Sequence, residues 1–219
     1  MIPKLDLSKI IQYPFPESQY YKEEQLKTQI VLHHTVSGVG AEGDIKFWMS
    51  DSKKIATAFV VARDGVIYQC FSSKYWGYHL GLQTNTYKKY GATYHSLDKT
   101  SIGIEIDSYG ALTNKNGTLY TAYNTVLNKP LEFVQYVKPF RGSNYFEKYT
   151  QAQIDATAVL VNYLCDKYNI PKDYNESMWD VSKEALEGKP GVWSHVSVRT
   201  DKSDLHPQPE VITMLKSLK

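Results

Sequence analysis

Histidines are the residues of this sequence best suited to metal binding or acid–base chemistry. There are six of them: His33, His34, His79, His95, His195 and His206. His33 and His34 end an apolar run, residues 29–34, whose pattern predicts a buried strand. Adjacent residues of a strand point to opposite faces, so the pair cannot easily share one metal ion. We therefore predict that one of the two is a ligand and that the other is structural.

A second set of side chains suited to chemistry lies in the non-helical segment 193–207. In order along the chain they are His195, Lys202, Asp204 and His206. Zinc at a catalytic site takes three protein ligands from His, Cys or carboxylate side chains and keeps a fourth position for water. His33, His195 and Asp204 would form such a set. Scattered polar residues on the surface are the alternative reading, and spacing alone does not choose between the two.

Two further residues could take part in hydrolysis at such a metal site. A metal ion lowers the pKa of water and polarises a carbonyl, so an amide can be hydrolysed near neutral pH. The segment 101–106 alternates strictly, which places Glu105 on the face opposite its three isoleucines. Glu105 could accept a proton from the attacking water. Lys202 could stabilise the charge that develops on the carbonyl oxygen.

The surrounding pattern predicts the elements that must hold these residues. Asp64-Gly65 between two strand-like runs predicts a two-residue hairpin turn. A short helix is expected with Asp44 as its cap. Thr150 and Gln153 form a capping box before a long amphipathic helix, and a last helix is expected at about 210–218. Strands followed by covering helices favour a single α/β domain.

Composition limits the class of protein. The chain has 219 residues, of which 42% are hydrophobic, and a net charge of +2, which suits one soluble domain. No run of Lys and Arg suggests nucleic acid as a partner. No stretch approaches the roughly 20 apolar residues that span a bilayer. The first residues show no secretory apolar segment, so we expect cytoplasmic synthesis without a signal peptide.

The expected organisation is an N-terminal arm, residues 1–27, followed by one catalytic domain, residues 28–219. Pro14 and Pro16 argue against regular structure in the arm. Two segments of weak periodicity, 108–149 and 169–190, are expected to be long surface excursions, which are often functional in compact domains.

Five blocks resemble, in the same order, a known family. They are Ile30-Val-Leu-His-His-Thr35, the Arg63-Asp64-Gly65 hairpin, Gly77-Tyr-His-Leu-Gly81, Ser101-Ile-Gly-Ile-Glu105, and Ser194-His195 with Lys202-Ser203-Asp204. This order is similar to that of the zinc N-acetylmuramoyl-L-alanine amidases of the type 2 class, which include phage lysozyme-like amidases and peptidoglycan recognition proteins. The resemblance spans about residues 28–215.

The resemblance implies a fold and a site. The fold would be α/β, with a central mixed sheet flanked by helices and Zn²⁺ at the floor of a substrate groove. Its ligands would be His33, His195 and Asp204, with Glu105 as the base and Lys202 as a catalytic residue. His79 would line the substrate cleft. Leu205-His206-Pro207 departs from the family's usual Pro-Gly, which leaves His206 as an alternative to Asp204.

The resemblance also implies hydrolysis of the amide bond between N-acetylmuramic acid and L-alanine in peptidoglycan. We expect a monomer that is a phage endolysin or a related lytic enzyme and that reaches the cell wall after release or export. An injected effector or a cytoplasmic recycling enzyme would also fit. A binding module without activity, and a zinc peptidase that cuts within the stem peptide, are the alternatives from other classes.

Overall fold

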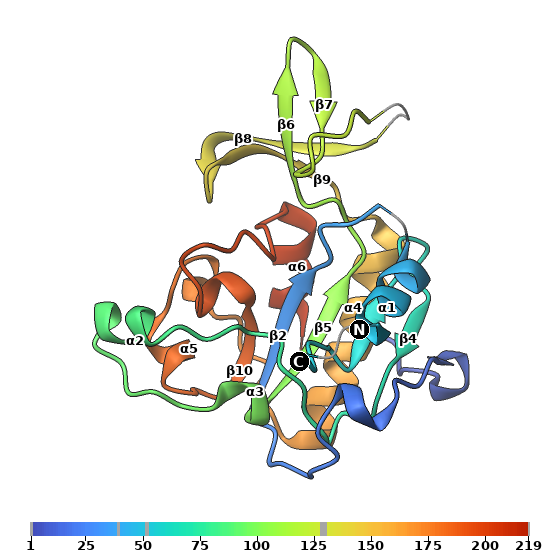
Figure 1. The fold of residues 1–219 in the computed structure, drawn as a ribbon, viewed down its shortest axis with the longest axis vertical. Helices are drawn as coiled ribbons and strands as arrows, with labels where there is room; N and C mark the ends of the chain where they lie inside the picture. The colour runs from blue at the N-terminus through green and yellow to red at the C-terminus, as the bar shows by residue number, and fades with distance from the viewer. Residues whose placement is uncertain (1, 39, 51–52, 128–130, 219) are drawn as a thin grey trace.

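A six-stranded mixed sheet forms the centre of the computed structural model, which describes residues 2–38, 40–50, 53–127 and 131–218 (Figure 1). The strand order is β1-β4-β3-β5-β2-β10, and β3–β4 is the antiparallel pair among parallel neighbours. The strands are β1 (Ile11–Gln12), β2 (Gln29–His34), β3 (Phe59–Val61), β4 (Ile67–Gln69), β5 (Ser101–Ile106) and β10 (Gly191–Ser194). This architecture confirms the predicted fold class.

β2 is an internal strand that pairs with β5 on one side and β10 on the other. All six of its residues are buried. A continuous apolar run is what a parallel strand with both faces covered requires, which is why the sequence predicted its bounds correctly. In the parallel register His33 lies beside Glu105. The strand therefore holds His33 rigidly next to the predicted base.

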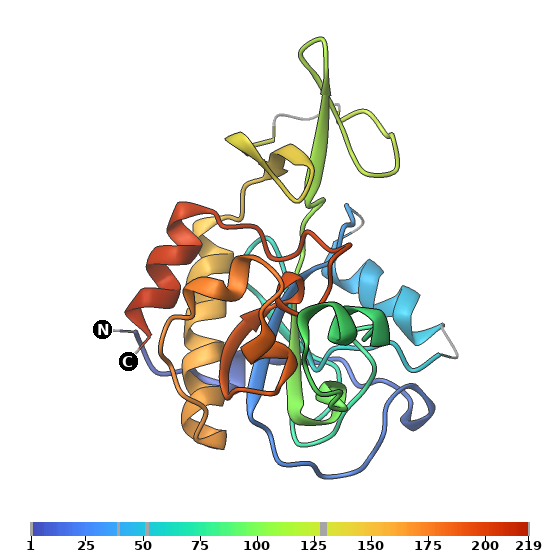
Figure 2. The same cartoon turned by 90° about the vertical axis from the view of Figure 1, so that its left-hand side faces the viewer.

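Helices cover both faces of the sheet. They are α1 (Ala41–Met49), α2 (Thr84–Tyr90), α3 (Leu97–Thr100), α4 (Gln151–Tyr168), α5 (Lys183–Leu186) and α6 (Pro209–Ser217). Short 3₁₀ helices are η1 (Leu7–Lys9), η2 (Glu17–Gln19), η3 (Glu176–Trp179) and η4 (His195–Ser197). Figure 2 shows α4 on one side of the sheet with α6 outside it, and α1 and α2 on the other side. None of the described helices is long and apolar enough to cross a membrane.

Two local predictions were wrong in detail. α1 begins at Ala41 after Gly40, whose φ of 85° sets the entry to the helix, so Asp44 lies inside the helix and does not cap it. The Asp44 carboxylate instead accepts hydrogen bonds from side chains just after β2. The β3–β4 hairpin forms, but Ala62 N–H bonds Val66 O at 2.9 Å, which leaves a three-residue turn ending in Gly65 (φ 85°). A three-residue turn with glycine in the left-handed region is a common hairpin connection.

The segment 108–149 is a second sheet that projects from the end of β5 (Figure 1). It is antiparallel, with the order β7-β6-β9-β8. Its strands are β6 (Ala111–Lys115), β7 (Thr118–Tyr120), β8 (Phe133–Phe140) and β9 (Ser143–Glu147). Segment 169–190 contains η3 and α5, and the N-terminal arm contributes β1 to the central sheet. The proposed division at residue 28 stays a prediction.

The two cysteines do not form a disulfide. Cys70 and Cys165 are both buried and free. Burial in apolar surroundings raises the pKa of each thiol to about 12. The thiols are therefore inert core side chains.

The capping box of α4 offers a test of the local folding argument. The Thr150 hydroxyl accepts the N–H of Gln153 at 3.1 Å, and the Gln153 side chain accepts the N–H of Thr150 at 3.0 Å. Thr150→Ala should lower the free energy of unfolding by about 1 kcal/mol, measured by chemical denaturation. Thr213→Ala on the exposed face of α6 is the control, because alanine costs nothing at an exposed helical position. Equal stability of the two variants would contradict the capping argument.

Candidate active site and metal centre

The predicted metal ligands come together at the edge of the central sheet where β10, β2 and β5 end. His33 lies near the carboxyl end of β2, and His195 follows β10 directly at the start of η4. Asp204 comes from the loop before α6. Because these three strands are parallel, their carboxyl ends open at the same edge, where loops can bring functional side chains together.

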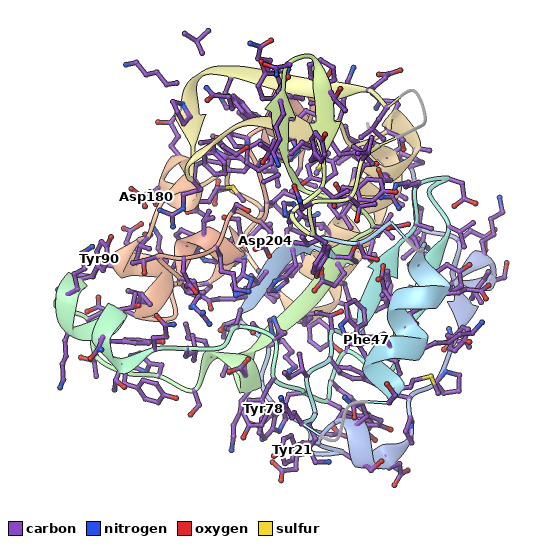
Figure 3. The ribbon with its side chains drawn as sticks, turned by 45° about the horizontal axis from the view of Figure 1, so that its top comes forward. Tyr21, Phe47, Tyr78, Tyr90, Asp180 and Asp204 are labelled. Atoms are coloured by element: carbon purple, nitrogen blue, oxygen red, sulfur yellow. The ribbon has the colours of Figure 1, made fainter. Side chains whose placement is uncertain are left out.

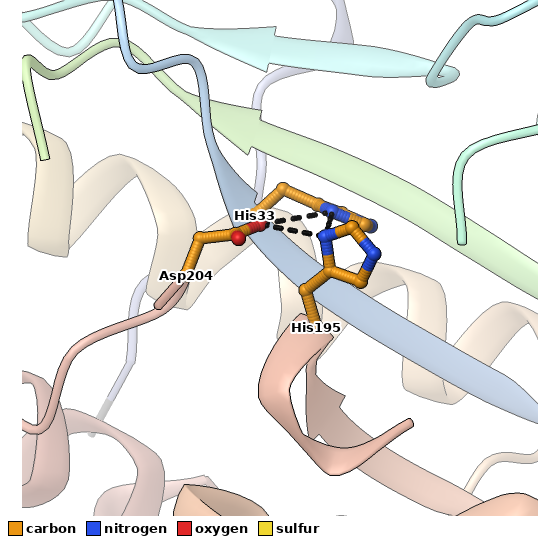
Figure 4. Close-up of side chains that lie close together, drawn as sticks. All are labelled: His33, His195 and Asp204. Atoms are coloured by element: carbon orange, nitrogen blue, oxygen red, sulfur yellow. Dashed lines mark hydrogen bonds and ion pairs between the residues drawn. The ribbon is translucent and has the colours of Figure 1, made fainter. Parts of the chain in front are cut away.

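Three side-chain atoms converge in this cluster (Figure 4). His33 Nδ1 lies 3.0 Å from His195 Nδ1 and 3.3 Å from Asp204 Oδ2. His195 Nδ1 lies 2.8 Å from Asp204 Oδ2. All three residues are buried, and among the described residues theirs is the group that could hold a metal ion. Two imidazoles and one carboxylate match the donor types of a catalytic zinc site.

Hydrogen bonds fix the tautomer of His33. The Ser101 hydroxyl donates to Leu97 O at 2.7 Å, so its oxygen must accept from His79 Nε2 at 2.8 Å. His79 Nδ1 is then an acceptor and receives the Nε2 proton of His33 at 2.9 Å. Burial lowers the pKa of His33 to about 4 and that of His79 well below its usual value, so both rings are neutral. His33 Nδ1 therefore carries a lone pair.

His195 is oriented in the same way. Its Nε2 donates to the carbonyl oxygen of Leu80 at 2.9 Å, so Nδ1 is the ring nitrogen that faces His33 and Asp204. The carbonyl is itself held in place, because Asp98 accepts the N–H groups of His79 at 2.8 Å and Leu80 at 3.0 Å. Two imidazole nitrogens and a carboxylate oxygen thus face one another in a buried space. This donor set is the one that a catalytic zinc ion takes, so the residues fit a bound metal ion.

The Asp204 carboxylate stays ionised in this cluster. Burial alone would raise its pKa, but the adjacent His195 and His33 outweigh that effect and hold the pKa well below its usual range. An ionised carboxylate is the form that binds a divalent metal. Asp204 thus supplies the negative charge of the donor set.

Glu105 lies beside this cluster with a different electrostatic character. Its Oε2 is buried and has no hydrogen-bond partner among the residues that the structure describes. Burial raises its pKa well above the usual value, and the charges of Asp204 and Asp44 raise it further, whereas Lys202 lowers it. Carboxyl groups with raised pKa values are suited to proton transfer near neutral pH. The structure therefore places two carboxyl groups with opposite pKa shifts in one site.

An open cavity of about 550 Å³ adjoins the cluster. His79, His195, Lys202, Arg199, Tyr78 and Tyr94 are among its lining residues. His79 reaches the cavity as predicted, but both of its ring nitrogens bond within the protein, so contact with substrate stays a prediction. Two larger cavities of about 770 Å³ lie along α4 and α6, and no residue of the cluster lines them among those described.

His206 does not belong to the metal cluster. Its Nε2 donates to Glu147 O at 3.0 Å, and its Nδ1 therefore accepts from the Tyr136 hydroxyl at 2.8 Å. The ring is stacked against Phe146 and Tyr149. Both nitrogens are occupied in the hydrogen bonds to the second sheet. Of the two alternatives for the third ligand, Asp204 is the residue in the cluster.

His34 points to the opposite face of β2, as strand geometry requires. Its Nδ1 lies 2.8 Å from the Tyr149 hydroxyl. It is buried and, like His206, lies outside the three-residue cluster. Tyr149 belongs to the segment that joins β9 of the second sheet to α4.

Ser101 and Asp98 are site residues that the sequence analysis did not single out. Ser101 had a detectable signal, since the alternation of β5 places Ser101, Gly103 and Glu105 on one face. Gly103 is part of the same arrangement: a Cβ there would lie 2.9 Å from His79 Nδ1, too close for the ring to keep its place. Asp98 lies in a short helix without any pattern that predicts its role.

Comparisons with known proteins identify the family. The sequence pattern described as N-acetylmuramoyl-L-alanine amidase matches residues 24–209. The chain belongs to this family of amidases. The resemblance noted from its five motifs is thereby confirmed, and so is its assignment as an amidase. No curated protein matches the sequence significantly.

Solved structures of this amidase's fold are similar at low sequence identity. PlyL is 14% identical, covers 96% of this chain and 98% of its own, and has a TM-score of 0.56. The PlyG catalytic domain is 14% identical, covers 95% and 94%, and has a TM-score of 0.55. A mutant endolysin from Bacillus subtilis is 16% identical, covers 94% and 96%, and has a TM-score of 0.54. At these identities the likeness establishes the fold.

The hydrogen-bond chain behind His33 can be tested through metal affinity. Ser101→Ala removes the group that fixes the His79 tautomer, so zinc affinity should fall by about 10–100-fold in competition with a chromogenic chelator. Thr100→Ala is the matched control, because the Thr100 hydroxyl also points to Leu97 O, at 3.5 Å, without touching His79. Equal zinc affinities of the two variants would refute the role of the hydrogen bonds that run from Leu97 to His33.

Proposed function

We propose that this amidase is a zinc-dependent enzyme that hydrolyses the amide bond between N-acetylmuramic acid and L-alanine in peptidoglycan. Membership of the amidase family supports peptidoglycan as the substrate and this amide bond as the one that is cut. The observation that carries the proposal is the convergence of three possible ligand atoms from His33, His195 and Asp204 beside a carboxyl group of raised pKa. A surface collection of polar residues would not be buried with its tautomers fixed.

The metal site would be formed by His33 Nδ1, His195 Nδ1 and an oxygen of Asp204. Zinc in such a site supplies a Lewis acid that polarises a carbonyl and makes water a better nucleophile at neutral pH. Both imidazoles keep their second nitrogen bonded to the protein, to His79 and to Leu80 O. These bonds raise the basicity of the ligands and hold the rings in the orientation that binding needs.

Glu105 would act as the general base and then as the general acid. Its side chain shares the face of the sheet with His33, and one of its oxygens has no partner within the protein. That oxygen is free to accept the proton of the attacking water. The protonated carboxyl group can then deliver the proton to the nitrogen of L-alanine as the amide bond breaks. Its raised pKa makes both transfers accessible near neutral pH.

Lys202 would stabilise the negative charge that forms on the carbonyl oxygen. It lines the cavity together with His79 and His195. A fixed cation beside a partly enclosed cavity interacts more strongly with developing charge than it would in open water. His79, on the cavity wall, positions His33 and would also contact the substrate.

A lytic role on the cell wall fits this chemistry. We propose an endolysin or a related lytic enzyme that acts as a monomer on peptidoglycan. Support comes from the shared fold with solved structures that include an endolysin of Bacillus subtilis. A binding module without activity has no need of the intact donor set, and a zinc peptidase would release different products. Both alternatives are outcomes of the following test.

Product analysis decides which bond is cut. Purified peptidoglycan is digested with the zinc-loaded protein, and the products are identified by mass spectrometry. We expect intact stem peptides with a free L-alanine amino group and separate glycan strands. His195→Ala, which removes one metal donor, should release none of them. Fragments cut within the stem peptide would identify a peptidase instead, and the absence of any cleavage across several peptidoglycan types would identify a binding module.

Glu105→Gln separates proton transfer from metal binding. The variant keeps the size of the side chain but cannot accept the proton, so kcat should fall by about 10²–10⁴-fold. Zinc content, measured by atomic absorption, should match that of the wild type because Glu105 is not among the three donors. Glu132→Gln is the control for the change of charge, because it removes an exposed carboxylate outside the site. Full activity of Glu105→Gln would exclude it as the base.

A further inference from the structure

Arg141 occupies an unusual place at the tip of the β8–β9 hairpin. Phe140 pairs with Ser143, so Arg141 and Gly142 form a two-residue turn. Both residues have positive φ, 48° for Arg141 and 86° for Gly142. Turns of this kind normally take Asn, Asp or Gly, because other side chains disfavour the left-handed region. An arginine at this position therefore calls for a reason in its side chain.

The Arg141 side chain leaves its own sheet and binds the backbone of the loop between His195 and Asp204. Its Nε donates to Lys202 O at 3.0 Å. Its Nη2 donates to Arg199 O at 2.7 Å and to Val196 O at 3.3 Å. One planar group thus binds three carbonyl oxygens that belong to a single loop.

The fourth contact of Arg141 is an ion pair at the outer edge. Its Nη1 donates to Asp180 Oδ1 at 2.9 Å. The Asp180 side chain is 75% exposed, whereas that of Arg141 is 18% exposed. Figure 3 shows Asp180 at the periphery and Asp204 near the centre, both below the second sheet. The carbonyl contacts, which face the protein, are thus the ones that bear on the site.

The loop that Arg141 binds carries most of the reaction chemistry. It starts at His195, ends at Asp204, and is closed by the hydrogen bond from Val196 N–H to Asp204 O at 2.9 Å. Lys202 lies within it and lines the cavity. The carbonyl of Lys202 accepts a hydrogen bond from Arg141 while its side chain faces the cavity. Fixing that carbonyl fixes the backbone from which the Lys202 side chain extends.

We propose that Arg141 is a positioning residue for this amidase and that the second sheet serves as a clamp on the loop from His195 to Asp204. The inference rests on the proposed function, since it assigns the loop a role in hydrolysis. Arginine suits the task because its rigid fork of five donors can reach several carbonyls at once. Lysine, with three donors on one flexible nitrogen, cannot span the same set.

The hairpin has anchors that do not depend on Arg141. The Tyr136 hydroxyl donates to His206 Nδ1 at 2.8 Å. The ring of His206 stacks on Phe146 at a centroid distance of 4.7 Å. Loss of the Arg141 side chain should therefore release the loop while the second sheet remains folded. This separation makes the proposal testable with single substitutions.

The test uses Arg141→Gly in the full-length chain, because glycine suits the positive φ and leaves the turn intact. We expect kcat to fall by about tenfold or more with little change in KM, and zinc affinity to weaken by about tenfold, as for other residues that orient metal ligands. Amide hydrogen exchange should speed up in residues 196–204. Added guanidinium ion should restore part of kcat in a saturable manner.

Lys138→Ala is the matched control, since it removes an exposed cation from the same hairpin. It should leave kcat, zinc affinity and hydrogen exchange unchanged. Unchanged values of all three in Arg141→Gly would overturn the clamp. If the wild type cuts no peptidoglycan, the proposed function fails, but zinc affinity and exchange of residues 196–204 still test the clamp. A uniform rise in exchange over the whole chain would also overturn it, because it would show general destabilisation.

Discussion

The parallel pairing of β2 with β5 and β10 is the constraint on which the site depends. Because Ser194 pairs with Leu32, the chain leaves β10 at the level of His33 and presents His195 to it. The same register on the other side places Glu105 next to His33. Side chains alternate along a strand, so a slip by one residue would turn His33 to the opposite face. The register of three buried strands therefore fixes both His33 and His195 of the donor cluster and the proposed base.

Behind these side chains, a continuous set of hydrogen bonds decides which nitrogen of each imidazole is available. It runs from a peptide carbonyl at Leu97 through Ser101 and His79 to His33. Each group donates a proton to one neighbour and accepts one from the next. The Leu97 carbonyl therefore decides which nitrogen of His79 and of His33 carries the proton. In a buried site such a pattern is costly to rearrange, because any change leaves a polar group without a partner. The metal centre is thus prepared by backbone geometry several residues away.

The sequence predicted those parts of the fold that local patterns control. The apolar run of β2, the alternation of β5 and the capping box of α4 each carry their own signal, and the bounds of the two strands and the start of the helix were correct. The second sheet was missed because β8 carries apolar side chains such as Phe133 and Val137 at exposed positions, so its sequence lacks the apolar/polar alternation that marks a strand. The donors were predicted by residue type and motif order. Arg141 could not be, because its contacts join residues more than 50 positions apart.

The two buried thiols have a chemical consequence for the whole molecule. Neither cysteine forms a cross-link, and neither belongs to the cluster of metal donors, which consists of nitrogen and oxygen atoms. A change from reducing to oxidising surroundings therefore has no bond to make or break in the core and no sulfur ligand to remove from the site. Within the described residues, neither the core nor the donor set therefore depends on a cysteine being oxidised or reduced.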